Sequence, residues 1–147
     1  MGRVIGILVV LVVFFGMHAY AGNADSILGE WYTEEERSLV EIYKCDALYC
    51  GKIVWLKHPT DEKGKEKVDL NNPDETRRDK KLLGLTILWD FNHRDSNEWA
   101  GGKIYDPKNG KTYSCKMMLD GNRLKVRGFV GISLLGRTTV WTKKIQS

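Results

Sequence analysis

From Gly29 onward, short apolar stretches alternate with turn residues about every eight to twelve positions, a spacing typical of an all-β domain. The alternation is clearest between Lys111 and Leu119, where the odd-numbered positions from Tyr113 onward are apolar and the even-numbered positions are mostly polar. The pattern predicts eight strands, at residues 29–34, 38–45, 49–57, 82–90, 98–105, 111–119, 123–129 and 137–143.

The turns between these strands favour local connections. Asp106 to Gly110 reads as a hairpin turn, because its proline presets φ and Gly110 can adopt the left-handed conformation that a bulged turn needs. Residues 120–122 form a second turn of this kind, and the Gly101-Gly102 pair indicates a bulge or a sharp bend inside a strand.

Eight short strands joined in this way predict a single eight-stranded antiparallel β-barrel with meander topology. Closure removes the exposed edges of the sheet. A barrel of eight strands is either filled by its own side chains or just wide enough for one small ligand. The strand pattern leaves these two possibilities open.

Residues 58–81 interrupt the strand pattern with a long, polar and charged connection. The run from Asp69 to Asp74 contains an Asn-Pro pair, which favours turns. Two interpretations remain open: an ordered stack of turns that covers one end of the barrel, or a lid that contacts a ligand. A calcium loop is disfavoured because Pro73 and Asp74 break the required order of ligands.

The first 21 residues have the three parts of a secretory signal peptide. Arg3 supplies a positive charge, Val4 to Met17 is an uncharged apolar run, and residues 19–21 form an A-x-A cleavage pattern. The alternative is an uncleaved membrane anchor, but a spanning helix needs about 20 apolar residues. We therefore expect cleavage after Ala21, no stable membrane span afterwards, a barrel domain at residues 22–147, and a periplasmic or secreted protein.

Composition narrows the class of protein further. The chain has 147 residues, of which 42% are hydrophobic and 29% charged, so collagen-like and disordered classes are excluded. Removal of residues 1–21 takes away one charged residue, Arg3, and lowers the net charge from +4 to +3. This mild positive charge is spread along the chain, so we expect no nucleic-acid partner.

The predicted export changes how the cysteines are interpreted, because disulfides persist in oxidising compartments. Cys45 and Cys50 flank a tight turn between two predicted strands, so we predict a disulfide that joins them. Cys115 is left over and is interpreted as a small buried hydrophobic residue, with a reactive thiol as the alternative.

Catalytic chemistry has little support in the sequence. His58 and His93 belong to no metal-binding spacing, and the stretch from Gly131 to Leu135 lacks the final glycine of a serine-hydrolase motif. Acidic residues such as Asp69 are interpreted as caps of turns. We therefore predict a protein that is not an enzyme, with no catalytic residue, no metal ligands and no cofactor.

Several segments together resemble the bacterial family of unknown function 2147 (DUF2147), a group of small exported proteins. The residues that carry the resemblance are Gly29-Glu30-Trp31, 50–56, Asp69, Asn72-Pro73, 83–85, 99–107, 109–113, 124–131, 135–138 and Trp141. The resemblance covers essentially all of the chain after the signal peptide. It implies a lipocalin-like barrel and supplies no activity.

A weaker resemblance concerns the first strand, where lipocalins carry a G-x-W motif. Gly29 and Trp31 fit this motif, and an arginine near the last strand packs across the tryptophan in that family. The resemblance implies that Arg127 or Arg137 closes the barrel floor through a cation–π contact with Trp31.

Three functions of different kinds follow. We favour the binding of a small apolar or amphipathic molecule, with the tryptophans either filling the core or lining a pocket. The alternatives are a cell-envelope interaction module that docks an unknown protein through residues 58–81, and, less favoured, an exported hydrolase. The candidate ligand-binding residues are Trp55, Asp69, Asn72, Trp89, Tyr113 and Met117.

Overall fold

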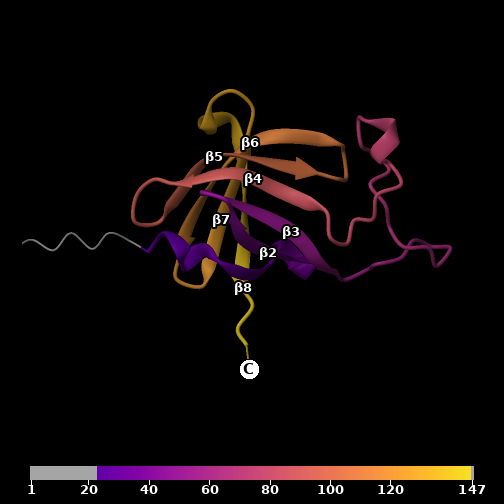
Figure 1. The fold of residues 1–147 in the computed structure, drawn as a ribbon, viewed down its shortest axis with the longest axis horizontal. Coiled ribbons are helices and arrows are strands. Elements are labelled where there is room, and N and C mark those ends of the chain that lie inside the picture. Colours follow the sequence, from indigo (N-terminus) through magenta and orange to yellow (C-terminus); the bar gives the residue numbers. More distant parts are fainter. Residues whose placement is uncertain (1–22, 147) are drawn as a thin grey trace, which may run out of the picture.

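The computed structural model describes residues 23–146, which form a closed barrel of eight antiparallel strands in chain order (Figure 1). The predicted signal peptide, residues 1–21, lies outside the described residues. The strands are β1 (Gly29–Tyr32), β2 (Ser38–Cys45), β3 (Leu48–Leu56), β4 (Thr86–His93), β5 (Glu98–Asp106), β6 (Lys111–Asp120), β7 (Arg123–Phe129) and β8 (Gly136–Lys143). Four short 3-10 helices accompany them: η1 (Ala24–Ile27), η2 (Glu34–Glu36), η3 (Glu75–Arg77) and η4 (Ser133–Leu135).

The predicted eight-stranded meander is confirmed, and the largest difference in boundaries concerns β4. The alternation predicts a strand from residue 82, whereas β4 begins at Thr86 and runs on to His93. Residues 82–85 are held by other contacts instead: Leu82 donates to the Lys67 carbonyl, and Gly84, at a φ of 89°, donates to the Ile53 carbonyl. Residues 82–85 are therefore apolar like the strand that follows them, but their hydrogen bonds join them to the long connection and to β3, so they do not extend β4.

Closure of the barrel is made by β1, which pairs with both β2 and β8. The predicted irregularity at Gly101-Gly102 is also confirmed, as the register of β5 against β6 shifts between Trp99 and Gly102. Gly102 faces Phe91 so closely that an added Cβ would lie 2.5 Å from its ring. The missing side chain therefore lets strand β5 approach an aromatic core residue.

Large side chains fill the interior. Trp31, Trp99 and Phe91 are fully buried, and Cys115 and Met117 of β6 face the same core. Met118, the one apolar residue that broke the alternation of β6, is exposed. The strand pattern thus reports correctly which face of β6 points inward.

The predicted disulfide is confirmed: Cys45 and Cys50 are joined across the hairpin between β2 and β3. Cys115 is buried, and burial raises the pKa of its thiol to about 12. A thiol with this pKa is protonated at neutral pH and is a poor nucleophile. Its observed role is therefore that of a small core residue.

No helix among residues 23–146 is long and apolar enough to cross a membrane.

Candidate functional site

The meander gives the barrel two different ends, because successive connections alternate between them. One end carries η1, the 46–47 turn, the 94–97 connection and the 121–122 turn; we call it the plugged end. The other carries the connections 33–37, 57–85, 107–110 and 130–135, and we call it the loop end. Figure 1 shows η1, in indigo, and the long magenta connection on opposite sides of the molecule.

Helix η1 closes the plugged end by accepting hydrogen bonds from two core tryptophans. The Trp31 indole donates to the Ile27 carbonyl at 2.9 Å, and the Trp99 indole donates to the Ala24 carbonyl at 3.1 Å. Ile27 itself is fully buried. A buried indole needs such a partner for its N–H group, so these two bonds position the plug.

A second contact fixes the same helix from outside. The hydroxyl of Tyr49 donates to the Asp25 carboxylate at 2.7 Å, and Lys44 pairs with that carboxylate at 3.0 Å. Both contacts hold the pKa of Asp25 below its ordinary value, the Tyr49 hydrogen bond most strongly. Burial first, and then the Asp25 contact, raises the pKa of Tyr49 to about 12.

The cation over Trp31 is Lys143, which corrects the prediction that Arg127 or Arg137 occupies this place. The Lys143 ammonium lies 4.7 Å from the ring centroid and donates to the Leu28 carbonyl at 2.8 Å. The strand register explains why Lys143 takes this place. Trp31 pairs with Lys143 at the end of β8, whereas Arg137 lies near the start of β8. Six residues of strand span about 20 Å, which no arginine side chain crosses.

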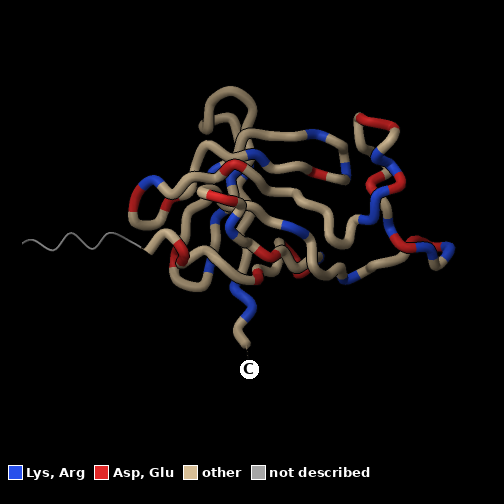
Figure 2. The backbone as a smooth tube through the Cα atoms, viewed as in Figure 1, with Lys and Arg blue, Asp and Glu red and all other residues tan. Residues whose placement is uncertain are grey.

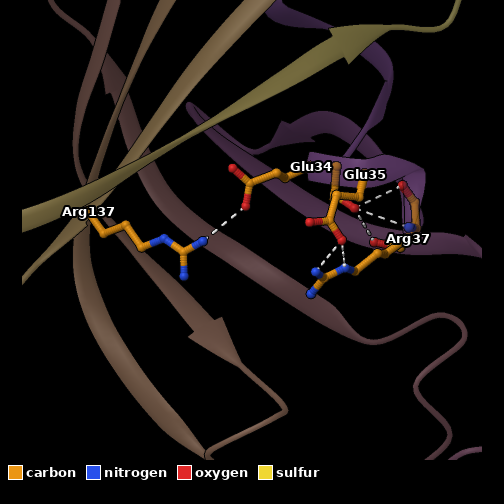
Figure 3. Close-up of polar contacts among 6 residues, drawn as sticks. Glu34, Glu35, Arg37 and Arg137 are labelled. Atoms are coloured by element: carbon orange, nitrogen blue, oxygen red, sulfur yellow. Dashed lines mark hydrogen bonds and ion pairs between the residues drawn. The ribbon is translucent and has the colours of Figure 1, made fainter.

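The two arginines act at the loop end instead. Arg137 pairs with Glu34 of η2 at 3.0 Å, and Arg37 contacts Glu35 within the same connection (Figure 3). The guanidinium of Arg127 donates to the Ser133 carbonyl at 2.6 Å and to the Leu134 carbonyl at 3.3 Å. Arg127 therefore supports the 130–135 connection and does not cover Trp31.

Two of the predicted ligand-binding residues, Asp69 and Asn72, form a polar cluster within the protein. Asp69 is fully buried, and its two carboxylate oxygens accept hydrogen bonds from the Tyr105 hydroxyl and the Asn72 amide, both at 2.7 Å. Burial, followed by the contact with Asp69, raises the pKa of Tyr105 to about 12. The cluster anchors the long connection to β5, and a role in ligand binding stays a prediction.

The neighbouring Asn71 ties the same connection to the β5–β6 hairpin. Its amide donates to the carbonyls of Pro107 and Lys108 at 3.0 and 2.9 Å. A Cβ added to Gly110 would lie 1.8 Å from the Asn71 carbonyl oxygen, so only glycine permits this approach. Two separate contacts thus fix the base of the connection, which favours the ordered-turn interpretation, and contact between this connection and a ligand stays a prediction.

Three of the other four candidates lie apart from one another. Met117 is buried opposite Trp99 near the plugged end, and Trp89 is half-buried and packs against the core beside the fully buried Leu88. Tyr113 is half-buried, and its hydroxyl accepts a hydrogen bond from Asn109. Alternation predicts which face of a strand points into the barrel. It does not predict whether the barrel interior is hollow, and core side chains fill the interior of this barrel.

Trp55 is the most exposed of the six candidates. It is 42% exposed and packs edge-to-face against Tyr32, with 6.2 Å between the ring centroids. Tyr32 ends β1 and Trp55 lies next to the end of β3, so both rings belong to the rim of the loop end. Tyr32 was not among the predicted site residues, because its partnership with Trp55 depends on the pairing of three strands.

Two hollows of similar size open to solvent. The first, of about 460 Å³, lies over β5 and β6 and reaches the 130–135 connection; the second, of about 440 Å³, lies along the end of the long connection. The first is lined by Ala100, Gly101, Gly102, Lys103, Ser114, Cys115, Lys116, Phe129 and Ser133. The second is lined by Arg77, Lys80, Lys81, Leu83, Gly84, Leu85 and Thr86. None of the candidate ligand-binding residues lines either hollow.

The 130–135 connection is a surface feature that the sequence did not reveal. Its large aliphatic side chains are exposed at the loop end. The signal was present as an apolar run between two predicted strands, but a run of this kind does not distinguish an exposed loop from a buried one.

The closed eight-stranded meander, with a helical plug beneath a G-x-W tryptophan and a cation over its ring, defines a lipocalin-like protein. The family profile described as "Uncharacterized protein conserved in bacteria (DUF2147)" matches residues 29–143, and the chain belongs to this family.

A solved structure supports the same fold. Protein HP1028 from Helicobacter pylori, described as belonging to the lipocalin family, superimposes with a TM-score of 0.69 at 23% sequence identity. The match covers 80% of this chain and 82% of the other. Among curated proteins, none matches this chain.

Proposed function

We propose that the protein is a non-enzymatic binder that holds one small apolar or amphipathic molecule at the loop end of the barrel. The observation that carries the proposal is the exposed ring of Trp55, packed against the half-buried Tyr32, on the rim of a barrel whose other end is plugged. Small-molecule sites combine aromatic and apolar side chains with a few polar groups.

The filled interior restricts how such a molecule is held. Trp31, Trp99 and Phe91 occupy the core, so the proposed site is shallow and uses the rim. The ion pair of Glu34 with Arg137 lies at the same end and supplies polar groups for the head of an amphipathic ligand (Figure 3). Arg137 is largely exposed, so an anionic head group can reach its guanidinium.

Binding can be tested with a fluorescent long-chain fatty acid and with native mass spectrometry of the gently purified protein. We expect Trp55→Ala to weaken binding of the probe about tenfold, because stacking area worth about 1.4 kcal/mol is lost from the rim. Leu83→Ala is the matched control, since Leu83 is similarly exposed, at 48% against 42% for Trp55, but lies on the long connection. Equal binding by Trp55→Ala and the wild type would contradict the proposal.

We propose that the protein works outside the cytoplasm. The disulfide between Cys45 and Cys50 supports this location, because such bonds persist in oxidising compartments. The predicted signal peptide supports it independently. N-terminal sequencing of the protein recovered from the periplasm and the medium tests both the location and the cleavage after Ala21.

The long connection supports a second candidate function, the docking of a protein partner through residues 58–81. Its base is anchored by Asp69 and Asn71, while its outer part extends from the barrel and carries many charged residues (Figure 2). A photo-cross-linker at Lys63 should then give one dominant adduct in cells. A diffuse set of adducts, unchanged when Lys65 and Lys67 are replaced by glutamate, would count against docking.

The hydrolase alternative has lost its main candidate. That candidate is Asp69, a carboxylate of the long connection, which is fully buried and has both of its oxygens engaged by Tyr105 and Asn72. We therefore propose no catalytic residue.

A further inference from the structure

The 130–135 connection presents an exposed aliphatic surface. Its large apolar side chains are exposed by 59% to 83%, and they are Val130, Ile132, Leu134 and Leu135. The remaining exposed large hydrophobic residues among those described are scattered over other elements. The connection also contains no charged residue and stands out at the top of the molecule in Figure 2. Grouped exposed apolar residues mark an interaction site more often than single ones.

The backbone of this connection is held in shape from beneath. The Arg127 guanidinium donates to the carbonyls of Ser133 and Leu134, and Leu135 donates to the Ile132 carbonyl at 3.1 Å. Several backbone carbonyls are therefore already hydrogen-bonded. This lowers the cost of moving the segment into an apolar medium, where an unpaired carbonyl is unfavourable. The aliphatic side chains remain outside this hydrogen-bonded base.

Basic residues lie directly beside the connection. The adjoining hollow is lined by Lys103 and Lys116 together with Ser114 and Ser133, and no carboxylate lines it. Lys103 donates to the Ser114 hydroxyl at 3.1 Å, and neither lysine pairs with a carboxylate among the described residues. The hollow is thus complementary to a phosphate group.

We propose that residues 130–135 insert their aliphatic side chains into the interface of a bilayer that contains anionic phospholipid, while Lys103 and Lys116 contact the phosphates. Apolar side chains beside lysines are the combination by which proteins bind such surfaces. A protein partner fits less well, because binding hot spots are enriched in Trp, Tyr and Arg, whereas the large side chains of the connection are all aliphatic. This surface is separate from the proposed ligand site at Trp55.

Sedimentation with vesicles tests the proposal. Residues 22–147 are used, because this is the chain expected after cleavage at Ala21; it contains the whole closed barrel and excludes the apolar run at Val4 to Met17. We expect binding to vesicles of phosphatidylcholine and phosphatidylglycerol, and at least roughly tenfold weaker binding to phosphatidylcholine alone. Leu134→Ser with Leu135→Ser should lower the affinity by at least about tenfold. Leu70→Ser is the control, since Leu70 is 69% exposed on another connection.

The lysines are tested separately. Lys103→Glu with Lys116→Glu should weaken binding to the anionic vesicles by more than roughly tenfold, as each lysine near such a surface contributes about fivefold. Lys63→Glu with Lys65→Glu is the matched charge control on the long connection. Thermal melts confirm that each variant is folded, and the fatty-acid probe should bind the leucine variant as it binds the wild type.

Three results would overturn the proposal: no binding of the wild type to anionic vesicles, equal binding to neutral vesicles, or unchanged binding by the leucine variant. A vesicle-free dimer that the leucine substitutions abolish would also overturn it, because the connection would then be a contact between two copies of the chain. Analytical ultracentrifugation detects such a dimer.

Discussion

The ammonium group of Lys143 lies 4.7 Å from the centre of the Trp31 ring and donates a hydrogen bond to the Leu28 carbonyl. One side chain of the last strand thus contacts the first strand and the segment that leads into it from the plug. The contact lies at the point where β1 and β8 close the barrel. The ammonium is partly removed from water, and this burial lowers the pKa of Lys143 below its ordinary value.

Lys143→Met should lower the free energy of unfolding by about 1–2 kcal/mol, because the aliphatic stem remains while the cation–π contact and the charged hydrogen bond are lost. Lys144→Met is the matched control. It removes the exposed ion pair with Glu30, and such pairs contribute little to stability because water screens them. Urea denaturation of both variants measures the difference, and equal losses would show that the Trp31 contact adds nothing.

Gly110→Ala should destabilise the protein by about 2–4 kcal/mol and loosen the long connection, because strain and a backbone clash add together. Its φ of 70° strains any other residue, and the added Cβ would meet the Asn71 carbonyl. Gly121→Ala is the control, because it has a φ of 57° with open space around it and should cost only about 1 kcal/mol. Limited proteolysis should cut residues 58–81 faster in Gly110→Ala than in the wild type or in Gly121→Ala. Identical cleavage of both variants would show that the contact between Asn71 and the β5–β6 hairpin does not hold the long connection in place.

Stability should fall between about pH 10 and pH 12. The pKa of Tyr105 is raised to about 12 in the folded protein, above its ordinary value of 10.0, so the unfolded chain loses this proton first. Unfolding then releases a proton, and the free energy of unfolding falls by about 1.4 kcal/mol per pH unit for this group. Tyr49 and Cys115 act in the same direction.

Tyr105→Phe isolates one contribution to this alkaline loss. The variant should be less stable than the wild type at about pH 8, because the buried Asp69 loses a donor. Its stability should nevertheless fall less steeply between about pH 10 and pH 11.5, since one titrating group is gone. Urea denaturation at a series of pH values measures both slopes, and parallel slopes would refute the link between Tyr105 and the loss.

Replacing both Cys45 and Cys50 by alanine should lower the free energy of unfolding by about 2 kcal/mol, since the short loop between them limits the entropy that the bond removes from the unfolded chain. A reducing agent should lower the melting temperature of the wild type to a similar extent and leave the double variant unchanged. Cys115→Ala tests whether any effect of the reductant comes from the remaining thiol. A reductant effect on the double variant would assign the loss elsewhere.

Short-range features of the chain predicted most of the fold. Alternation along β6, the turn glycine Gly110 and the Cys45–Cys50 spacing each depend on residues close together in the chain. Helix η1 was not predicted, because a helix of four residues is too short to give a periodic pattern of apolar positions. Its position became visible only through the two indoles that bond to it.

The candidate site was less predictable, because its members come from distant strands. Trp55 was identified as an aromatic candidate, but Tyr32 was not, and Met117, a candidate for lining a pocket, is buried in the core. Asp69 was identified as a site residue from its place in a polar loop. The loop path that buries it against Tyr105 is set by a contact between residues 36 positions apart.

The eight strands, their meander order, the hairpin disulfide and the family could all be read from the chain before folding, because each depends on local spacing or on a joint pattern of residues. Folding in three dimensions was needed to establish that Lys143 and not an arginine covers Trp31, that Asp69 is an anchor, and that the 130–135 connection is exposed. Those outcomes depend on strand register and on the path of the connections across the barrel. Register is set by all eight strands together, and no single stretch of the chain contains it.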